Sequence, residues 1–505
     1  LERNLPAHAD KTALFSYERN LTFQEVSAEV NQVGNALKEL GVNFGEHVGI
    51  LCLDQPAWVT SFFGIGKIGA TAVSLNTLLT TNDFKFILHD SRVRVLIIHG
   101  SLLGKIEPIR DELPFLDHVI VIGESEHARD EDRQFFDWID DKSTNLKAAP
   151  THQEDFCSLN YSSGTTGMPK GIPHSPKDYV LQADRWGKET LGLEESDRTF
   201  AVAKLFFTFG MGGTLIFPWY VGASTVLFSG PPRVATNVLE VIEEFEPTIF
   251  YNAPTSYSAI LEQDDFPQDW DISSLRLCVS AGEALPGPLW ERWKETTGLD
   301  IIDGIGTTEN YHIFISNRPG DIKAGSSGKI VEGYDVKIVD PDGEPVEQGE
   351  IGDLLLKTDT VAPFYWHQYE ASQRAMRGEW FFTGDKYYQD EDGYYFHAGR
   401  SDDMMKVGGI WVSPVEVEST LISHDAVQEC AVVEKRDQTD LVKPKAYVIL
   451  SADYQPSDEL EEELIEYTRS EIADYKRPRW VEFRDELPKT ATEKIQRYKL
   501  REDES

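Results

Sequence analysis

A short polar segment of the chain, residues 161–171, carries hydroxyls, glycines and one lysine at close spacing. Glycine lets a backbone approach an anion, and backbone N–H groups and side-chain hydroxyls can then donate hydrogen bonds to phosphate oxygens. The residues that could hold phosphate in this way are Ser162, Ser163, Gly164, Thr165, Thr166, Gly167 and Lys170. An ordinary surface loop can have the same composition, so this segment predicts an ATP-handling enzyme only if the rest of the chain supplies matching chemistry.

The segment differs from the P-loop of the NTPases. A P-loop has serine or threonine directly after its lysine, at the start of a helix, whereas here Pro169 precedes Lys170 and Gly171 follows it. A kinase or a GTPase is therefore disfavoured.

Two further polar segments each follow an apolar run. Ala281-Gly282-Glu283 comes directly after the run that ends at Ser280, and its small residues leave room for a flat base. Residues 304–309 come after Ile301-Ile302 and put hydroxyls and a carboxylate at the end of an expected strand. Both segments could therefore contribute to a nucleotide site.

Three segments nearer the C-terminus offer an acid and fixed cations. Asp385 follows Thr383-Gly384, Arg400 and Lys406 come soon afterwards, and Lys494 lies in a polar turn. Each has a plainer alternative, since an aspartate in a turn commonly caps a neighbouring amide and a lysine near a chain end is commonly solvated.

The elements that must position these segments follow from the hydrophobic pattern. Apolar runs typical of buried strands alternate with stretches of helical length. Strands are expected at residues 48–53, 95–99, 118–122, 224–228, 248–251 and 275–280, and helices at 22–40, 58–70, 234–244 and 285–297. This alternation predicts an α/β architecture with largely parallel sheets, in which ligands gather at the loops after strand ends.

The pattern changes after about residue 333 to shorter strands separated by turn signals such as Asp340 to Gly343. Asp392-Gly393 lies between two aromatic runs, which is typical of a hairpin tip. Further helices are expected at residues 414–422 and 459–473. We expect a boundary at residues 401–403, which separates residues 1–400 from residues 404–505.

The composition excludes some partners. The chain has 505 residues, with 86 acidic against 48 basic ones and a formal net charge of −38. Nucleic acid and anionic membranes would repel such a surface. At about 1 M salt the Debye length falls to about 3 Å and exposed like charges are screened, so we expect a halophilic setting, with an ordinary acidic protein as the alternative.

The cysteines lie far apart in the sequence, without a spacing typical of a disulfide framework or a zinc site. No apolar stretch is long enough to span a membrane, and no signal-peptide pattern is present. We therefore expect a soluble, cytoplasmic protein.

Taken in order along residues 161–497, these motifs resemble the adenylate-forming superfamily of acyl-CoA synthetases, luciferases and adenylation domains. Within it the chain is most similar to benzoate-CoA and related aryl-CoA ligases, through residues 204–207, 312–314, 399–406, 411–414 and 442–446. The resemblance implies a large N-terminal domain of mixed and parallel sheets with helices, followed by a small mobile α+β C-terminal domain.

The resemblance also implies the reaction. A carboxylate and Mg-ATP would give an acyl-adenylate and pyrophosphate, and the thiol of coenzyme A would then displace AMP. The partners would be an aryl carboxylate, benzoate or a substituted benzoate, together with ATP and coenzyme A, in the degradation of aromatic acids. A homodimer is left open.

Roles for the nucleotide residues follow from the same resemblance. Lys494 would stabilise the charge that gathers on the α-phosphate in the transition state. Glu309, and more weakly Thr308, would bind Mg²⁺, because a hard ion prefers oxygen ligands. Asp385 would accept hydrogen bonds from the ribose hydroxyls with the help of Arg400. The phosphate segment would hold the β- and γ-phosphates, and the residues flanking adenine would be Ala281, Gly282, Glu283, Asp303, Gly304 and Ile305.

The second half-reaction involves the C-terminal part. Asp402 matches the hinge of the family, and rotation about it would carry Lys494 away and bring in Lys406. Gly408 and Gly409 would then leave room for the pantetheine arm. A plain helix cap is the alternative for Asp402. Lys443 and Lys445 are candidate contacts for the phosphates of coenzyme A, with a solvated pair as the alternative.

The residues that match or adjoin the acyl pocket of aryl-CoA ligases are Phe206, Phe207, Thr208, Phe209, Tyr251, His312 and Ile313. Flat aromatic walls suit a benzoate ring, although aromatic runs are also typical of a protein core. Thr208, Asn310 and Tyr311 differ from the residues expected for plain benzoate, which favours a hydroxy- or amino-substituted ring.

One departure from the family is Glu493, because a glycine usually precedes the catalytic lysine. If that backbone is left-handed, a non-glycine residue costs on the order of 1 to 2 kcal/mol. Alternative functions are a fatty acyl-CoA synthetase, a carrier-loading adenylation enzyme and an AMP-binding regulator.

Overall fold

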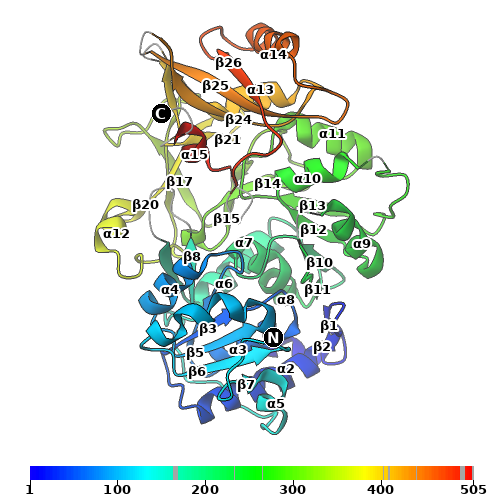
Figure 1. Cartoon of the computed structure of the whole chain (residues 1–505), viewed down its shortest axis with the longest axis vertical. Coiled ribbons are helices and arrows are strands. Elements are labelled where there is room, and N and C mark those ends of the chain that lie inside the picture. Colours follow the sequence, from blue (N-terminus) through cyan, green and yellow to red (C-terminus); the bar gives the residue numbers. More distant parts are fainter. Residues whose placement is uncertain are drawn as a thin grey trace. The chain divides into compact units, whose positions relative to one another are not determined.

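The computed structural model describes residues 1–162, 169–231, 234–263, 265–401, 403–407, 410–438, 441–489 and 495–502. The chain divides into two compact units. The first contains Leu1–Tyr251, Thr307–His312 and Asp359–Met376, and the second contains Asn252–Gly306, Ile313–Thr358 and Arg377–Ser505. Figure 1 labels many of the elements of both units.

One sheet of the first unit has the strand order β7-β6-β5-β3-β4-β8-β9. Its strands are β3 (His47–Leu51), β4 (Thr71–Ser74), β5 (Val95–His99), β6 (His118–Ile122), β7 (Arg133–Gln134), β8 (Ser158–Ser162) and β9 (Lys170–His174). The pairs from β7 to β8 are parallel, whereas β8 and β9 are antiparallel. The strands β3, β4, β5 and β6 are almost entirely buried, as expected for parallel strands covered on both faces.

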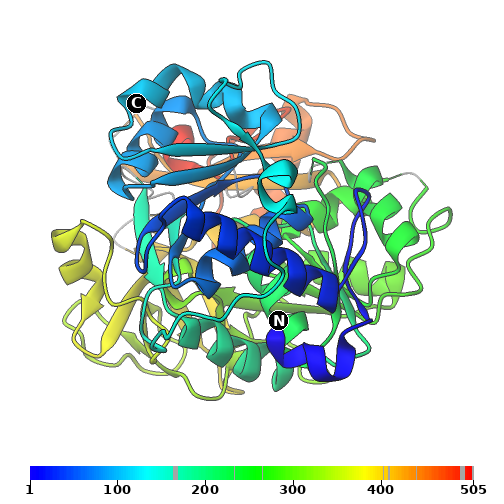
Figure 2. The same ribbon diagram turned by 90° about the horizontal axis from the view of Figure 1, so that it is seen from below.

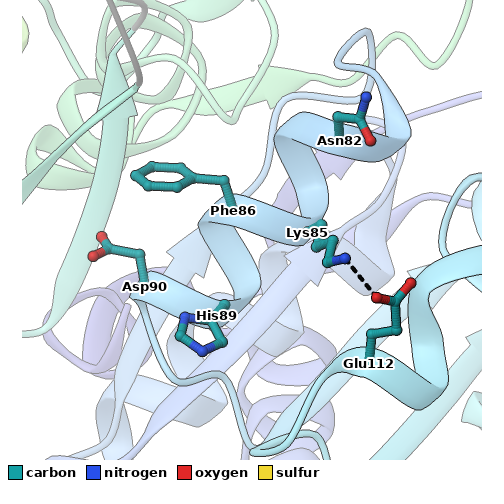
Figure 3. Close-up of a pocket in the computed structure, with 6 residues that line it drawn as sticks. All are labelled: Asn82, Lys85, Phe86, His89, Asp90 and Glu112. Atoms are coloured by element: carbon teal, nitrogen blue, oxygen red, sulfur yellow. Dashed lines mark hydrogen bonds and ion pairs between the residues drawn. The ribbon is translucent and has the colours of Figure 1, made fainter.

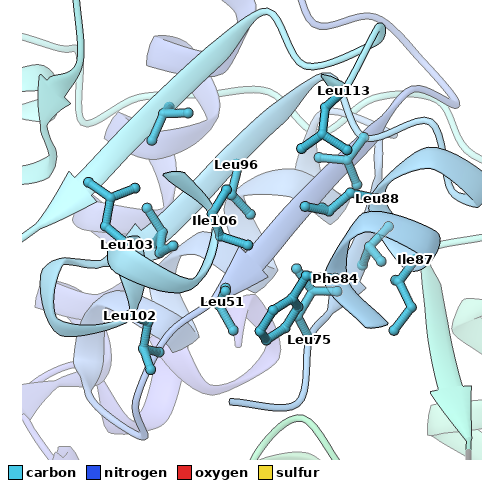
Figure 4. Packing of buried hydrophobic residues seen from close by; sticks show 14 of the residues in the cluster. Leu51, Leu75, Phe84, Ile87, Leu88, Leu96, Leu102, Leu103, Ile106 and Leu113 are labelled. Carbon is cyan, nitrogen blue, oxygen red and sulfur yellow. The ribbon is translucent and has the colours of Figure 1, made fainter. Parts of the chain in front are cut away.

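Helices cover this sheet. They are α2 (Phe23–Glu39), α3 (Pro56–Lys67), α4 (Thr81–Asp90) and α5 (Phe135–Asp140), with the short 3₁₀ helices η2 (Gly100–Lys105) and η3 (Glu107–Glu112). A capping box of Thr22 and Glu25 starts α2, which packs against α3 (Figures 1 and 2). Leucines, isoleucines and Phe84 from α4, η2, η3 and the strands fill the space between them (Figure 4).

The other sheet of the first unit contains β1 (Thr12–Phe15), β2 (Leu21–Thr22), β10 (Arg198–Ala201), β11 (Ser224–Val226) and β12 (Ile249–Asn252). Strand β10 pairs in parallel with β11 and β12, and β11 pairs in parallel with β1. Its helical elements are η1 (Glu2–Asn4), α1 (Leu5–His8), α6 (Pro176–Gln182), the π-helical η4 (Ala183–Lys188), α7 (Thr208–Met211), the π-helical η5 (Gly212–Ile216), α8 (Phe217–Val221) and α9 (Ala235–Phe245). The same unit includes η6 (Thr308–Asn310) and α12 (Tyr369–Ala375).

The second unit begins with α10 (Pro254–Leu261), β13 (Leu277–Ser280), α11 (Gly287–Thr297), β14 (Ile301–Gly306), β15 (Ile313–Ser316) and β16 (Lys329–Ile330). Strands β13 and β14 are parallel, and β14, β15 and β16 continue antiparallel. A second, antiparallel group contains β17 (Asp335–Val339), β18 (Gly352–Lys357), β20 (Trp380–Gln389) and β21 (Tyr395–Arg400). The short β19 (Met376–Arg377) precedes β20.

The last part of the chain in this unit contains a hairpin of β22 (Met405–Val407) and β23 (Ile410–Val412). A sheet of β24 (Val427–Arg436), β25 (Val442–Leu450) and β26 (Trp480–Phe483) follows, with β24 antiparallel and β26 parallel to β25. Its helices are α13 (Pro414–Ile422), α14 (Asp458–Glu471) and α15 (Arg497–Glu502).

The observed elements confirm the α/β class, and the turn at Asp392-Gly393 does join the antiparallel strands β20 and β21. Most of the other expected bounds differ from the observed ones by one to three residues. Strand β3 ends at Leu51 and α3 begins at Pro56, because Pro56 occupies the first helical position and Asp54-Gln55 form the turn before it. Among the described residues, no helix is both long enough and apolar enough to cross a bilayer.

Candidate active site

The described ends of the phosphate segment lie on β8 and β9. Ser162 and Lys170 are partners in the antiparallel register of these strands. Ser163, Gly164, Thr165, Thr166 and Gly167 lie outside the described residues. The ladder therefore holds the first hydroxyl and the lysine of the predicted segment opposite each other.

Tyr365 connects Lys170 with Glu309. The Lys170 ammonium lies 4.8 Å from the centre of the Tyr365 ring, and the Tyr365 hydroxyl donates a 2.7 Å hydrogen bond to Glu309 Oε1. Such contacts attract a cation to the ring face and orient a carboxylate. Tyr365 was not predicted from the sequence, because nothing in its aromatic neighbourhood indicates a carboxylate 56 residues away.

The segment that carries Tyr365 is tied to β9. The Trp366 backbone N–H donates to the Gly171 carbonyl at 2.7 Å, and the Ala362 N–H donates to the Glu309 carbonyl at 2.7 Å. A methyl group at Gly171 would come within 2.9 Å of the Trp366 Cβ. The absence of a side chain at Gly171 therefore permits this close approach.

Asp90, at the end of α4, anchors the same region. Its carboxylate accepts hydrogen bonds from the Tyr161 hydroxyl at 2.6 Å and from His367 Nδ1 at 2.9 Å. Asp90 also lines a surface pocket of about 340 Å³ with Asn82, Lys85, Phe86, His89 and Glu112 (Figure 3). Since Lys85 is paired with Glu112 at 2.6 Å and Asp90 is bound from within the unit, these charged groups already have partners.

Thr308 and Glu309 lie in the turn η6, which buried polar contacts hold in place. His174 Nε2 donates to the Thr308 carbonyl at 2.7 Å, and Gln182 Nε2 donates to the Asn310 carbonyl at 2.8 Å. Tyr311 follows with φ of 72°, an uncommon conformation for a residue with a side chain. The turn thereby fixes the directions of Glu309 and His312.

His312 lies within a cage of aromatic rings. Its ring centre is 4.9 Å from that of Trp186, 5.5 Å from Phe209 and 4.5 Å from Phe217. The ring of Phe209 in turn meets Tyr251 at 6.0 Å. The structure thus brings Phe209, Tyr251 and His312 together as predicted, and it adds Trp186 and Phe217.

The chemistry of His312 is that of a neutral ring. Burial lowers its pKa to about 3, against the opposing effect of the Phe209 carbonyl. The Nε2–H of His312 donates a hydrogen bond to that carbonyl at 3.4 Å, which leaves Nδ1 as an acceptor. Nδ1 is buried and has no hydrogen-bond partner among the described residues.

The other residues that were predicted for the acyl pocket lie outside the ring contacts around His312. Phe206 and Phe207 pack edge to face at 4.4 Å, and Thr208 is buried at the start of α7. Ile313 is buried on β15, where its side chain packs against Gly304 of β14. Ile313 therefore belongs to the second unit, whereas the His312 cage belongs to the first.

The predicted adenine residues lie directly after the end of β13 and on the neighbouring strand β14, in the second unit. Ser280 and Asp303 are partners in the parallel register of β13 and β14, so Ala281-Gly282-Glu283 starts beside Asp303. Gly282 has φ of +99°, which favours glycine. Burial raises the pKa of Asp303 well above its usual range. Its Oδ1 has no hydrogen-bond partner in the described part of the chain.

Asp385 and Arg400 form the predicted pair. They are partners across β20 and β21, with Arg400 Nη1 2.9 Å from Asp385 Oδ1, and His397 Nε2 lies 3.6 Å from the same oxygen. Burial acts to raise the pKa of Asp385, but Arg400 and His397 outweigh it and lower the pKa to about 2. Asp385 is thus an ionised acceptor at neutral pH, and His397 is a partner that sequence analysis missed.

Many of the C-terminal residues predicted for the hinge, coenzyme A binding and catalysis lie outside the described residues. They are Asp402, Gly408, Gly409, Glu493 and Lys494. The residue after Lys494 is described: the Ile495 N–H donates to Glu283 Oε1 at 3.2 Å. Lys406 is exposed on β22. Lys445 is buried and paired with Glu482 at 2.6 Å, so it is not a solvated lysine.

Comparison with known proteins assigns the chain to a family. Residues 1–366 match the AMP-binding enzyme family and residues 416–494 match the AMP-binding enzyme C-terminal domain. The chain belongs to the AMP-binding enzyme family. Its fold is the adenylate-forming fold, with a large N-terminal mixed α/β domain and a small C-terminal domain. The boundary at residues 401–403 stays a prediction.

Similar proteins indicate which reaction this family member catalyses. The chain is 43% identical over 502 residues to a benzoate-CoA ligase of Thauera aromatica, which covers 99% of this chain and 94% of that protein. A benzoate CoA ligase structure from Burkholderia xenovorans shares 38% identity with a TM-score of 0.91, covering 99% of this chain and 98% of that one. This family member is an AMP-forming aryl-CoA ligase.

A further solved structure is more similar in sequence. It is an anthranilate CoA ligase in complex with anthranoyl-AMP, at 63% identity and a TM-score of 0.97, covering 99% of this chain and 96% of that one. The predicted resemblance to aryl-CoA ligases is confirmed.

Proposed function

We propose that the aryl-CoA ligase activates a benzoate that carries a hydrogen-bond donor on its ring, of the anthranilate type. Two observations support this substrate. The chain is 63% identical to an anthranilate CoA ligase, and the buried Nδ1 of His312 is an acceptor without a partner among the described residues. The second observation carries the proposal, because an amino or hydroxyl group on the ring could donate to that nitrogen, whereas unsubstituted benzoate could not.

The walls of the cage suit the same substrate. Trp186, Phe209 and Phe217 surround His312 with flat apolar surface, and aromatic rings pack favourably on such surface. The neutral state of His312 matters because a protonated ring would present a donor at Nδ1. Since burial lowers its pKa to about 3, Nδ1 remains an acceptor throughout the physiological range.

The nucleotide roles remain those that the family resemblance implies. Ser162, Lys170 and the rest of the phosphate segment hold the triphosphate, the Ala281 and Asp303 segments flank adenine, and Asp385 accepts from the ribose hydroxyls. The low pKa of Asp385 supports its role, because an ionised carboxylate is the stronger acceptor.

Magnesium fits the Glu309 site. Glu309 and Thr308 offer hard oxygen donors, and the Tyr365 hydroxyl holds the carboxylate in one orientation. Mg²⁺ in such enzymes is commonly held by few carboxylates together with substrate phosphates and water, and when bound it would neutralise phosphate charge. Glu309 and Thr308 would be its protein ligands.

The thiol step is assigned to the C-terminal residues. Lys406, with Gly408 and Gly409, would receive coenzyme A after rotation about Asp402. Lys406 is an exposed residue of β22.

The substrate is tested by pyrophosphate release with a panel of benzoate, anthranilate, 2-hydroxybenzoate, and 3- and 4-aminobenzoate. We expect the highest kcat/KM with an amino- or hydroxybenzoate. In His312→Phe the ratio of anthranilate to benzoate kcat/KM should fall roughly five- to tenfold, since a neutral hydrogen bond contributes about 1 kcal/mol.

A matched control changes the cage without removing the acceptor. Phe209→Leu should lower kcat/KM for both acids to a similar extent, with their ratio kept. If benzoate is the best substrate of the wild type, or if His312→Phe leaves the ratio unchanged, the acceptor role of His312 is wrong.

We also propose that the protein acts in a cytoplasm of high salt, in the degradation of aromatic acids. The net charge of −38 supports the first point and the cytoplasmic supply of ATP and coenzyme A supports the location. A homodimer stays a prediction that light scattering can test.

A further inference from the structure

Asp54 is a buried acid that none of the roles above uses. It lies in the turn between β3 and α3 and is 3% exposed. Both of its carboxylate oxygens accept from the Leu205 backbone N–H, at 3.1 and 3.3 Å. Leu205 follows β10, which belongs to the other sheet of the first unit. Asp54 therefore connects the end of one sheet to the segment that leaves the other.

The segment bound by Asp54 contains the predicted acyl residues. We name residues 204–209 the acyl loop. It begins with Lys204 and contains the Phe206–Phe207 pair, and its last two residues, Thr208 and Phe209, start α7. Phe209 contacts His312, so the backbone bond at Leu205 lies four residues from the proposed substrate cage.

Lys204 is the cation whose charge acts on Asp54. Its ammonium donates to the carbonyls of Phe228 at 2.6 Å and Gly230 at 2.9 Å. Burial lowers the pKa of Lys204, while the negative charge of Asp54 acts to raise it. The ionised carboxylate thus favours the charged form of Lys204 and, with it, the contacts that tie the acyl loop to residues 228–230.

We propose that Asp54 is a positioning residue, whose ionised carboxylate holds the acyl loop in the conformation that receives the aryl acid. The proposal rests on the proposed aryl-acid pocket. It assigns to Asp54 an effect on binding of the acid and none on binding of ATP.

The charges around Asp54 determine the pH at which its carboxylate gains a proton and no longer holds the acyl loop. Burial raises the pKa of Asp54 to about 6, Lys204 and the Leu205 N–H act to lower it, and Glu18 from the turn between β1 and β2 acts to raise it. Cys52, which lies with Asp54 between β3 and α3, stays a neutral thiol, since burial raises its pKa to about 12. Below about pH 6 the carboxylate gains a proton and loses its charge, so binding of the aryl acid should weaken as the pH falls.

The same raised pKa makes ionised Asp54 unfavourable for stability. Because the folded pKa lies above the usual value of 3.8, the folded state binds more protons between the two values, and stability falls as the pH rises through this range. Asp54→Asn should therefore unfold at a temperature no lower than the wild type at pH 7.5.

The test measures KM for anthranilate and for ATP between pH 5.5 and 8.5. At pH 7.5 Asp54→Asn should raise KM for the acid at least fivefold and change KM for ATP less than twofold. In the wild type KM for the acid should rise below about pH 6, and this rise should be absent in Asp54→Asn. Protonation of the substrates affects the wild type and Asp54→Asn equally. A difference between their pH profiles of KM is therefore due to Asp54.

The control is Asp197→Asn. Asp197 is another buried acid and precedes β10 at the opposite end of the strand, where it accepts from the Glu194 N–H at 2.8 Å and the Thr248 hydroxyl at 2.7 Å. Its variant should leave KM for the acid and its pH profile unchanged. Equal effects of both variants, or a parallel rise in KM for ATP, would overturn the proposal.

Amide hydrogen exchange tests the proposal without catalysis. Asp54→Ala removes the acceptor, so a peptide covering the acyl loop should lose protection at least tenfold relative to wild type, after correction for intrinsic rates. If the wild type activates no aryl acid, the proposed function fails, and exchange still decides the role of Asp54. Unchanged protection would show that Asp54 does not hold the loop.

Discussion

Glu309 and Lys170 take their orientation from the same side chain. The Tyr365 hydroxyl bonds the Glu309 carboxylate and its ring faces the Lys170 ammonium. A tyrosine is suited to this position because it combines a hydroxyl donor with an aromatic face. The orientation of the proposed magnesium ligand therefore depends on one buried hydroxyl.

Tyr365→Phe removes that hydroxyl and keeps the ring. Because a hydrogen bond to a charged group contributes about 1.5 to 3 kcal/mol, we expect kcat for adenylation to fall roughly tenfold or more, with KM for the aryl acid unchanged. Pyrophosphate release over a Mg²⁺ titration measures this effect. Tyr369→Phe, an exposed change in the same segment, is the control and should have wild-type activity.

Lys494 is expected to act only in the first half-reaction. Lys494→Ala should lower adenylation at least 100-fold, as expected when a charge-stabilising donor is removed, and should spare thioester formation from supplied acyl-adenylate. Glu493→Gly should raise the adenylation rate if its carboxylate weakens Lys494. Equal loss of both half-reactions in Lys494→Ala would contradict the division of roles.

At the scale of elements, the segment of residues 359–376 acts as a brace on the phosphate strands. Trp366 pairs with Gly171 on β9, and Gln368 donates to the Pro169 carbonyl at 3.2 Å. The brace also carries Tyr365. Its register on β9 therefore determines where both Lys170 and Glu309 lie.

Gly171→Ala tests the brace. The added methyl would meet the Trp366 Cβ at 2.9 Å, so the segment must shift, at an overpacking cost of about 1 to 3 kcal/mol. We expect a several-fold rise in KM for ATP and a lower unfolding temperature. In Gly66→Ala the methyl enters open space on α3, and this control should be at least as stable as the wild type. Wild-type ATP binding in Gly171→Ala would argue against the brace.

At the scale of the whole protein, the net charge of −38 is the dominant electrostatic feature. Many acids do have partners, such as Asp132 with Arg110, but 86 acidic residues far exceed 48 basic ones. The excess must repel itself at low ionic strength. Stability of this aryl-CoA ligase should therefore depend on salt.

We expect the unfolding temperature to rise by several degrees between 0.1 M and 1 M KCl, as the Debye length shortens from about 10 Å to about 3 Å. Calorimetry or dye-monitored unfolding measures it. Chloride is preferred to sulfate, because sulfate also strengthens apolar burial. A flat or falling unfolding temperature would favour the ordinary acidic protein over the halophilic one.

The amino-acid sequence determined the chemical inventory and the class of fold. Strands β5 and β6 and helix α13 have the bounds that the pattern predicts, because an apolar run between polar residues and a helical spacing of apolar residues are both local signals. The motifs also indicated Asp385 with Arg400 and the pair Thr308 and Glu309, whose roles stay predictions. Each set lies in a short polar stretch along the chain, and Asp385 pairs with Arg400 across β20 and β21.

The tertiary structure determines which residues far apart in the sequence come into contact. Asp54 meets Leu205 across 151 residues, Tyr365 meets Glu309 across 56, and Trp186 joins His312 in the cage. No local pattern encodes such pairs, because they depend on which loops the packed sheets bring together. Burial then sets the chemistry, lowering the pKa of His312 and raising that of Asp54, since removal of water disfavours the charged form of each.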